Sequence, residues 1–165
     1  MKHAVRSAGT LLLMGTLMMG TGFAACAEEE VVEPAGYHVY DTTDDSSTDT
    51  WYGIARGTYL KAGTSTITKE DSTHASGTGK TLAHSKCDRV YVRIYLDQSD
   101  TGKSGSWGTL DYWTGTATNA TVATVSSGSY KVTKNKYYRV TGAHSATKGT
   151  TTESTTSCTN SLKFD

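Results

Sequence analysis

The sequence has little proline, phenylalanine and cysteine, and no excess of charge of either sign. Among its 165 residues are one proline, two phenylalanines and three cysteines, and its formal net charge is +0. No stretch reaches the roughly 20 consecutive apolar residues that a transmembrane helix needs. These shortages argue against a membrane-spanning protein and against a zinc site made of thiolates.

Hydroxyl-bearing residues dominate what is present. The chain holds 30 threonines and 17 serines, together with 17 glycines and 10 tyrosines. Threonine and tyrosine favour β-strands, and glycine and serine favour the turns between them. This composition is typical of a β-rich extracellular domain, and it argues against a helical bundle or a nucleotide-binding α/β enzyme.

The N-terminus has the pattern of an export signal. Lys2 and Arg6 precede an apolar run from Leu11 to Gly20, and small residues follow it. Such a run is too short to span a bilayer but suits the central part of a signal peptide. We therefore expect residues 1–27 to be a signal peptide and the protein to be secreted.

Two processing routes fit this leader. Cleavage after Ala27 would release a secreted, extracellular protein. Alternatively, the FAAC string ending at Cys26 would make that cysteine the lipidated first residue of a lipoprotein at the cell surface. Phe23 stands where a lipoprotein signal normally has leucine, so simple secretion is favoured.

Charge is distributed unevenly along the rest of the chain. Residues 28–49 contain eight acidic side chains and no lysine or arginine, whereas 14 basic and 8 acidic residues follow from Thr50 onward. The acidic segment has no sustained apolar period, which is typical of a solvated linker. We predict a disordered acidic tether over residues 28–50 and a basic domain over residues 51–165, although each charge could simply solubilise its own segment.

One strand is especially clear in this domain. Val90, Val92, Ile94 and Leu96 alternate with Arg89, Tyr91, Arg93 and Tyr95, which is the period of a strand with one buried face. Further strand-like runs recur about every 8 to 12 residues, separated by glycine, serine or asparagine. This spacing predicts an all-β fold, a small antiparallel β-sandwich of the immunoglobulin-like or jelly-roll-like kind, with Trp107 or Trp113 enlarging its core.

Two cysteines lie within the predicted domain. Cys87 and Cys158 each begin a predicted strand, and a bridge between them would close a loop of 72 residues. Cysteine pairs in exported proteins are usually oxidised, so we expect an intrachain disulfide between them. Free thiols, or a bond to another chain, are the alternatives.

Several motifs together resemble a known family. They are the CDRVYV strand, the Gly-Ser-Trp turn at Gly105–Trp107, the YYRVTGAHS string at Tyr137–Ser145 and the Thr-Glu-Ser string at Thr152–Ser154. In this order they resemble an uncharacterised secreted family of Gram-positive bacteria, a domain of unknown function. The resemblance implies export and a small all-β domain, and it supplies no catalytic residue.

Candidate catalytic and metal-binding patterns are weak. SGTGKT at Ser76–Thr81 lacks the first glycine of a phosphate-binding loop, because that position is His74. A hairpin could bring Glu153 toward His144, but a cross-strand polar pair explains this equally well. The histidines lack the short spacings of a metal site, so we expect no metal and no cofactor.

The alternation around Arg89 leaves one face of the strand aromatic and cationic. Its side chains could stack on sugar rings and bind carboxylate or phosphate. The alternatives are a solvated sheet face or a second buried face. The candidate binding residues are Arg89, Tyr91, Arg93 and Tyr95, joined by Tyr137 and Arg139 from a neighbouring strand.

These observations favour a secreted or surface-attached, non-catalytic β-sandwich that acts as a binding or structural module, for which an anionic glycan or cell-wall polymer is the candidate ligand. An antimicrobial or toxin-like protein is the first alternative, and an extracellular hydrolase is the second. Nucleic acid is not an expected partner, because the chain carries an export signal and no nucleic-acid-binding motif. The sequence leaves the oligomeric state open.

Overall fold

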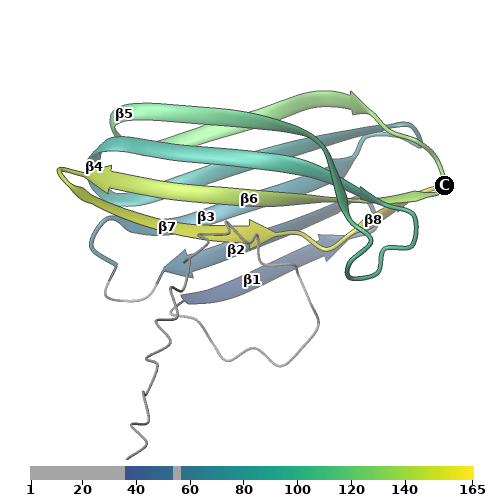
Figure 1. The fold of residues 1–165 in the computed structure, drawn as a ribbon, viewed down its shortest axis with the longest axis horizontal. Helices are drawn as coiled ribbons and strands as arrows, with labels where there is room; N and C mark the ends of the chain where they lie inside the picture. The colour runs from purple at the N-terminus through teal and green to yellow at the C-terminus, as the bar shows by residue number, and fades with distance from the viewer. Residues whose placement is uncertain (1–35, 54–56) are drawn as a thin grey trace, which may run out of the picture.

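The computed structural model of the protein describes residues 36–53 and 57–165. This part of the chain forms eight β-strands and no helix (Figure 1). The predicted signal peptide over residues 1–27 and the alternative prediction of a lipidated Cys26 fall outside the described residues. The strands are β1 (Gly36–Thr43), β2 (Ser46–Gly53), β3 (Leu60–Lys69), β4 (His74–Ser99), β5 (Gly108–Lys131), β6 (Lys136–Lys148), β7 (Thr151–Cys158) and β8 (Leu162–Phe164).

All eight strands belong to one antiparallel sheet, in which the principal order is β1-β2-β3-β4-β6-β7. The unusually long β4 organises this sheet. Along one edge, its first half pairs with β3 and its second half with β6, while β5 pairs with the other edge over almost the whole length. The short β8 pairs with the start of β6.

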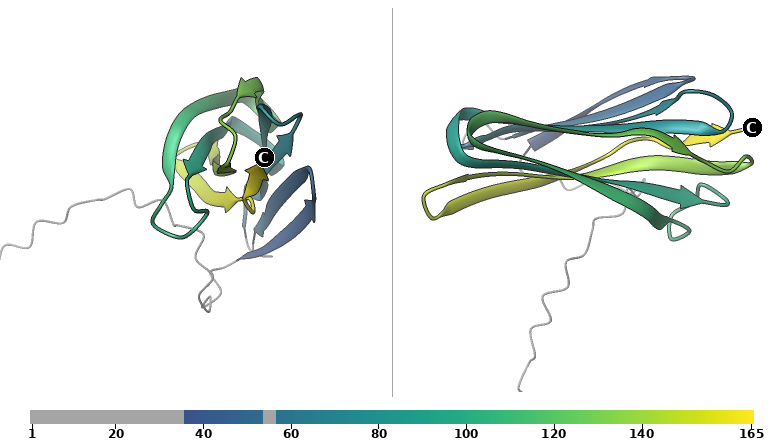
Figure 2. Two further views of the ribbon diagram at one scale, coloured as in Figure 1. Left: turned by 90° about the vertical axis from the view of Figure 1, so that its right-hand side faces the viewer. Right: turned by 90° about the horizontal axis from the view of Figure 1, so that it is seen from above.

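The ribbon made of β4 and β5 folds back on itself (Figure 2). Its pairing is interrupted between Leu82 and Cys87, and β5 bends at Asn119, whose φ is +49°. The two halves of β4 then face each other so closely that a Cβ at Gly79 would lie 2.5 Å from Ile94. The continuous sheet therefore supplies both layers of a sandwich, which confirms the predicted all-β antiparallel fold.

The hydrophobic core lies between these layers. Val90, Val92, Ile94 and Leu96 are buried, as their alternation predicts. The largest side chains around them are Leu60, Ile67, Tyr138, Val140 and Phe164. Trp113 packs against this cluster, whereas Trp107 does not belong to it.

Side chains of β2 accept hydrogen bonds from the backbone at the end of β7 and just after it. The buried carboxylate of Asp49 accepts a hydrogen bond from the backbone N–H of Cys158 at 2.7 Å. The Ser47 hydroxyl accepts another from the N–H of Asn160 at 3.0 Å. His38 Nδ1 lies 2.9 Å from both carboxylate oxygens of Asp49.

The predicted boundary between tether and domain is wrong. Residues 36–53 form the hairpin of β1 and β2, and Asp49 is a buried residue. The acidic composition of this segment predicted a solvated tether instead of a hairpin. Three of its aspartates, Asp41, Asp44 and Asp45, do face solvent, but its threonines and serines supply the β-propensity for two strands. The domain therefore includes residues from Gly36 onward, and residues 28–35 lie outside the described part.

The predicted bridge between Cys87 and Cys158 is also wrong, because Cys87 is a buried free thiol. Cys158 pairs with Thr141, which pairs with Tyr95, so its register position lies eight residues along β4 from Cys87. At about 3.3 Å per residue this separation is roughly 26 Å, whereas a disulfide requires Cα atoms within about 7 Å. Neither cysteine begins a strand as predicted, because Cys87 lies in the middle of β4 and Cys158 ends β7.

Candidate functional site

Four of the predicted binding residues form a row on the outer face of β4. We call Arg89, Tyr91, Arg93 and Tyr95 the tyrosine–arginine row; Arg89 is exposed and the other three are half-buried. The guanidinium carbon of Arg89 lies 4.7 Å from the centre of the Tyr91 ring, and that of Arg93 lies 5.8 Å from it. The row is therefore a set of cation–π contacts that water can reach.

The neighbouring strand β5 adds Tyr112 to this surface. Tyr112 pairs with Tyr95, and the centres of their rings are 6.1 Å apart. Its ring also lies 4.9 Å from the guanidinium carbon of Arg93. A hydrogen bond with Tyr95 raises the pKa of Arg93, so this guanidinium is charged at every ordinary pH. Its buried Nε atom has no hydrogen-bond partner among the described residues.

Next to the row, Arg139 forms an ion pair with Asp97. The pair connects β6 to β4, its Nε–Oδ2 distance is 3.3 Å, and both side chains are more than nine-tenths buried. Burial lowers the pKa of Arg139, and the charge of Asp97 opposes this shift. Asp97 also accepts hydrogen bonds from the hydroxyls of Thr109, at 2.7 Å, and Thr141, at 3.3 Å. The carboxylate is therefore held by three side chains from the two strands that flank β4.

The loop between β4 and β5 brings Trp107 to this ion pair. The Ser99 hydroxyl accepts hydrogen bonds from the backbone N–H groups of Thr101, at 3.1 Å, and Gly102, at 2.8 Å. Gly102 has a φ of +70°, which favours glycine. The loop ends with Trp107, whose ring centre lies 4.2 Å from the guanidinium carbon of Arg139.

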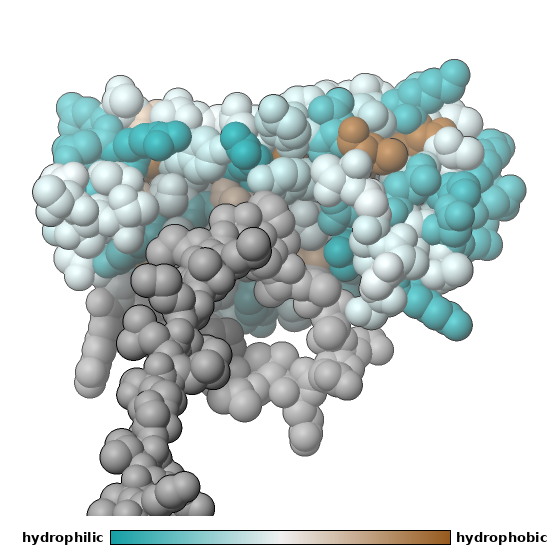
Figure 3. Space-filling model, in the orientation of Figure 1, coloured by the Kyte–Doolittle hydropathy of each residue, from teal (hydrophilic) through white to brown (hydrophobic). Residues whose placement is uncertain are grey.

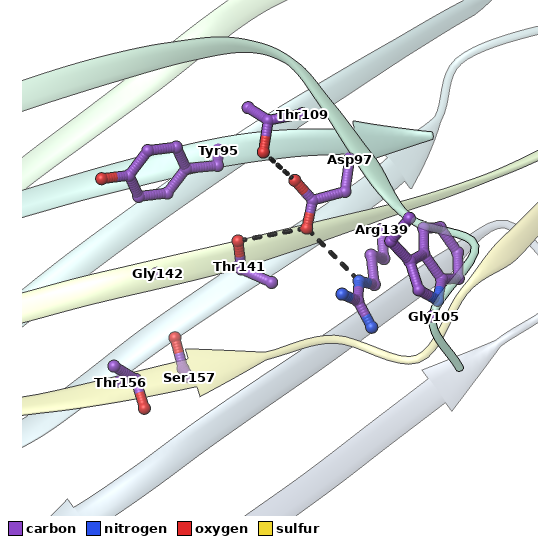
Figure 4. Close-up of a pocket in the computed structure, with 10 residues that line it drawn as sticks. Tyr95, Asp97, Gly105, Thr109, Arg139, Thr141, Gly142, Thr156 and Ser157 are labelled. Carbon is purple, nitrogen blue, oxygen red and sulfur yellow. Dashed lines mark hydrogen bonds and ion pairs between the residues drawn. The ribbon is translucent and has the colours of Figure 1, made fainter. Parts of the chain in front are cut away.

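These groups line a pocket of about 260 Å³, which we call the Trp107 pocket. Figure 4 shows that the two terminal nitrogens of Arg139 point away from Asp97, and that Thr156 and Ser157 of β7 form another side. Aromatic, cationic, anionic and hydroxyl groups thus meet in one concavity. This arrangement suits a ligand that is itself partly apolar and partly hydrogen-bonding.

Tyr137 does not join the tyrosine–arginine row. It pairs with Ser99, beyond Asp97, and its ring packs under the loop so closely that a Cβ at Gly102 would lie 3.1 Å from it. Arg139 does lie on the same face as the row, but its partners are Asp97 and Trp107. The six predicted residues therefore divide among the row, the pocket and the support of the loop.

The candidate catalytic pair is not assembled. The carboxylate of Glu153 accepts hydrogen bonds from the backbone N–H groups of residues 58–60, at 2.7 to 2.9 Å. Burial would raise the pKa of Glu153, but these three hydrogen bonds outweigh it and lower the pKa. Ser145, as expected for a strand neighbour, lies on the face opposite the buried His144.

His144 belongs to a buried network of hydrogen bonds. Its Nδ1 lies 2.9 Å from the hydroxyl of Thr81, and its Nε2 lies 2.8 Å from the hydroxyl of Ser157. The Thr81 hydroxyl also donates to the carbonyl of Tyr91, and the Ser157 hydroxyl donates to that of Ser65 at 2.7 Å. Burial lowers the pKa of His144 from 6.5 to about 4, and the imidazole is neutral at pH 7.

Other sequence patterns have ordinary places in the fold. Ser76–Thr81 lies within the first half of β4, so its glycines and lysine do not form a phosphate-binding loop. Within residues 36–53 and 57–165 there is no cluster of three side chains suited to a metal ion. The same part of the chain contains no helix that could cross a membrane.

Sequence reasoning missed the residues that complete the site. Asp97 continues the alternation of the row and could have been found from it. Trp107 ends the Gly-Ser-Trp turn, which gave no indication that its indole would meet Arg139. Tyr112, Thr109 and Thr141 are placed by pairing across strands, and a register shift between Leu96 and Asp97 hides part of that pairing from the sequence.

The fold and the candidate site define a small antiparallel β-domain with an aromatic and charged outer face beside a polar pocket. The chain belongs to a family of unknown function, DUF6147, whose model matches residues 25–162. This match confirms the resemblance to an uncharacterised family, and it includes the β1–β2 hairpin. No curated protein and no solved structure matches the chain.

Proposed function

We propose that the protein is an exported, non-catalytic binding module that holds an anionic glycan or cell-wall polymer on the outer face of β4. The observation that carries this proposal is the tyrosine–arginine row, in which Arg89 and Arg93 lie over tyrosine rings at 4.7 to 5.8 Å. Tyrosine rings offer apolar faces to sugars, and guanidinium groups bind carboxylate or phosphate in paired hydrogen bonds.

The charge of the whole domain supplies little of this affinity. From Gly36 to Asp165 the chain has 14 basic and 12 acidic residues, a balance of +2. From Thr50 onward the net charge is +6, because that part of the chain excludes the four aspartates of the β1–β2 hairpin. Recognition of an anion therefore depends on the local cations of the row.

The character of the surface also supports a polar ligand. Figure 3 shows a face that is mostly hydrophilic or neutral, with hydrophobic colour confined to small areas. A broad apolar patch would favour a hydrophobic protein partner instead. A polymer with both hydroxyl and acidic groups matches the mixture of threonine, tyrosine and arginine on β4 and its neighbours.

The test is co-sedimentation of the purified full chain with isolated bacterial cell walls, and binding to soluble polygalacturonate, at low and high salt. We expect binding that weakens with salt, because solvent-exposed charges are screened. A variant with both Arg89→Gln and Arg93→Gln is expected to lose at least tenfold in affinity for polygalacturonate.

The matched control carries Lys131→Gln and Lys134→Gln, which remove the same charge from two exposed positions away from the row. This control is expected to bind nearly as well as the unchanged chain. Equal losses in both double variants would mean that only overall charge matters, and no binding to either probe would overturn the proposal.

A further inference from the structure

The Trp107 pocket differs in charge from the row beside it. The row carries two arginines, whereas in the pocket the charge of Arg139 is paired with that of Asp97 at 3.3 Å. A free anion entering the pocket would meet the carboxylate as well as the guanidinium. An uncharged molecule with many hydroxyls would pay no such electrostatic cost.

We propose that the Trp107 pocket is a binding site for one uncharged sugar ring. This deepens the proposed function and rests on it only for the class of ligand, a glycan. The row would then hold the acidic groups of the polymer, while the pocket selects a neutral ring next to them. A polyanion without such a ring would engage only the row.

The hydrogen-bonding groups of the pocket fit this ligand. Only the Nε–H of Arg139 takes part in the ion pair, and both terminal nitrogens are turned away from Asp97 (Figure 4). Thr141 and Thr156 add hydroxyl-bearing side chains to the lining, whereas the hydroxyl of Ser157 is turned toward His144. Sugar hydroxyls both donate and accept, so they match a site that offers both kinds of group.

Trp107 supplies the apolar part. The indole is half-exposed although Arg139 lies 4.2 Å from its centre, so part of its surface is open to a ligand. The C–H groups of a sugar ring can pack on that surface while the hydroxyls reach the polar wall. A volume of about 260 Å³ is at the small end for ligand sites, and it suits a single ring.

The pocket is fixed before any ligand arrives. Ser99 holds the start of the loop through two backbone N–H groups. The Ser106 hydroxyl donates to the carbonyl of Lys103 at 2.6 Å, one residue before Trp107. Thr109 and Thr141 hold Asp97 in place. A preformed site loses less conformational entropy on binding, which favours recognition of a small neutral ligand.

The test is titration of the full chain with uncharged oligosaccharides, chitotetraose and cellotetraose, at low and high salt. The readout is the indole N–H signal of Trp107 in the NMR spectrum, assigned by its loss in Trp107→Phe. We expect this signal to shift with at least one of the two sugars, equally in both salt conditions, because no net charge is involved.

Paired variants separate recognition from folding. Trp107→Ala is expected to weaken sugar binding at least tenfold and to leave the backbone amide spectrum of the strands unchanged. Thr109→Val, which removes the hydrogen bond to Asp97, is expected to weaken it several-fold, whereas Thr109→Ser restores it. The double variant Lys131→Gln and Lys134→Gln, at two exposed positions outside the row and the pocket, keeps full affinity for the neutral sugar.

The possible outcomes distinguish the two proposals. Salt-sensitive binding of polygalacturonate without any effect of neutral sugars would overturn the pocket assignment and leave the row standing. Salt-independent sugar binding that requires Trp107, without binding of polygalacturonate or cell walls, would support the pocket and overturn the row. In Trp107→Ala, which has no indole at this position, binding is followed at the backbone amides, and sugar-induced amide shifts that persist in this variant would place the ligand elsewhere and overturn this inference.

Discussion

The two faces of the second half of β4 differ in what they require from their neighbours. On the inner face, Val90, Val92, Ile94 and Leu96 are almost fully buried between the layers. On the outer face, Tyr91, Arg93 and Tyr95 are half-buried and contact one another and Tyr112. The inner face therefore stabilises the packing of the two layers, whereas the outer face is accessible to a ligand.

Polar groups obey the same division. The inner side of the sheet also buries Asp49 of β2 and His144 of β6. Each has hydrogen-bond partners: Cys158 and His38 for the aspartate, Thr81 and Ser157 for the histidine. The outer face has the opposite property, because the terminal nitrogens of Arg139 point into a pocket. A buried polar group that is already satisfied stabilises the fold, and one that faces a pocket is available for recognition.

The largest expected effect is on the inner face. Ile94→Ala should lower the free energy of unfolding by about 4 kcal/mol, because it leaves a cavity where the two halves of β4 meet. Thr116→Ala, an exposed position opposite Tyr91 on β5, should change it by less than about 0.5 kcal/mol. Urea denaturation measures both, and similar losses in the two variants would contradict the division between faces.

A pair of aspartates tests the same comparison within the β1–β2 hairpin. Asp49→Ala should cost about 3 kcal/mol, because it leaves the buried N–H of Cys158 without its acceptor and removes the partner of His38. The exposed Asp41→Ala should be nearly neutral. If both variants unfold at the same urea concentration as the unchanged chain, the hairpin contributes nothing to the stability of the domain, and the prediction of a disordered tether would be supported.

Acidification should weaken the inner face through His144. Its pKa is about 4 in the folded protein and 6.5 as a free side chain, so the unfolded chain binds the proton first. The resulting stability is fully present above pH 6.5, falls as the pH is lowered, and is lost below pH 4, a total of about 3 kcal/mol. Burial raises the pKa of Asp49, which opposes part of this loss.

Urea denaturation at pH 7 and pH 5 measures this dependence, and about 2 kcal/mol should be lost between the two. His144→Gln provides the control: it should be less stable at pH 7 and should depend less on pH. A His144→Gln variant with the same pH dependence as the unchanged chain would show that other groups titrate.

The smallest effect on stability is expected on the outer face. Tyr91→Ala removes the ring that lies beneath Arg89 and Arg93, and cation–π contacts at exposed sites contribute about 0.5 to 1 kcal/mol. The same variant should lose most of its affinity for polygalacturonate, which equilibrium binding measures. A large loss of stability together with unchanged affinity would make the row a structural feature.

Local alternation was enough to predict the strand at the centre of the molecule and which of its side chains are buried. It also placed four binding candidates on one face, because neighbouring strand residues point to opposite sides. Composition failed at the hairpin, where acidic residues on the exposed face hid a buried Asp49. Long-range register decided the rest: it separates Cys87 from Cys158 and brings Tyr112, Trp107 and Arg139 to β4.

The most direct test of the whole account is an NMR titration of the full chain with polygalacturonate, followed at the backbone amides of β4, β5 and β6. The account predicts shifts that concentrate at Arg89, Tyr91, Arg93, Tyr95 and Tyr112 and that disappear at high salt. Shifts that concentrate on the β1–β2 hairpin instead, with the outer face of β4 unchanged, would contradict it.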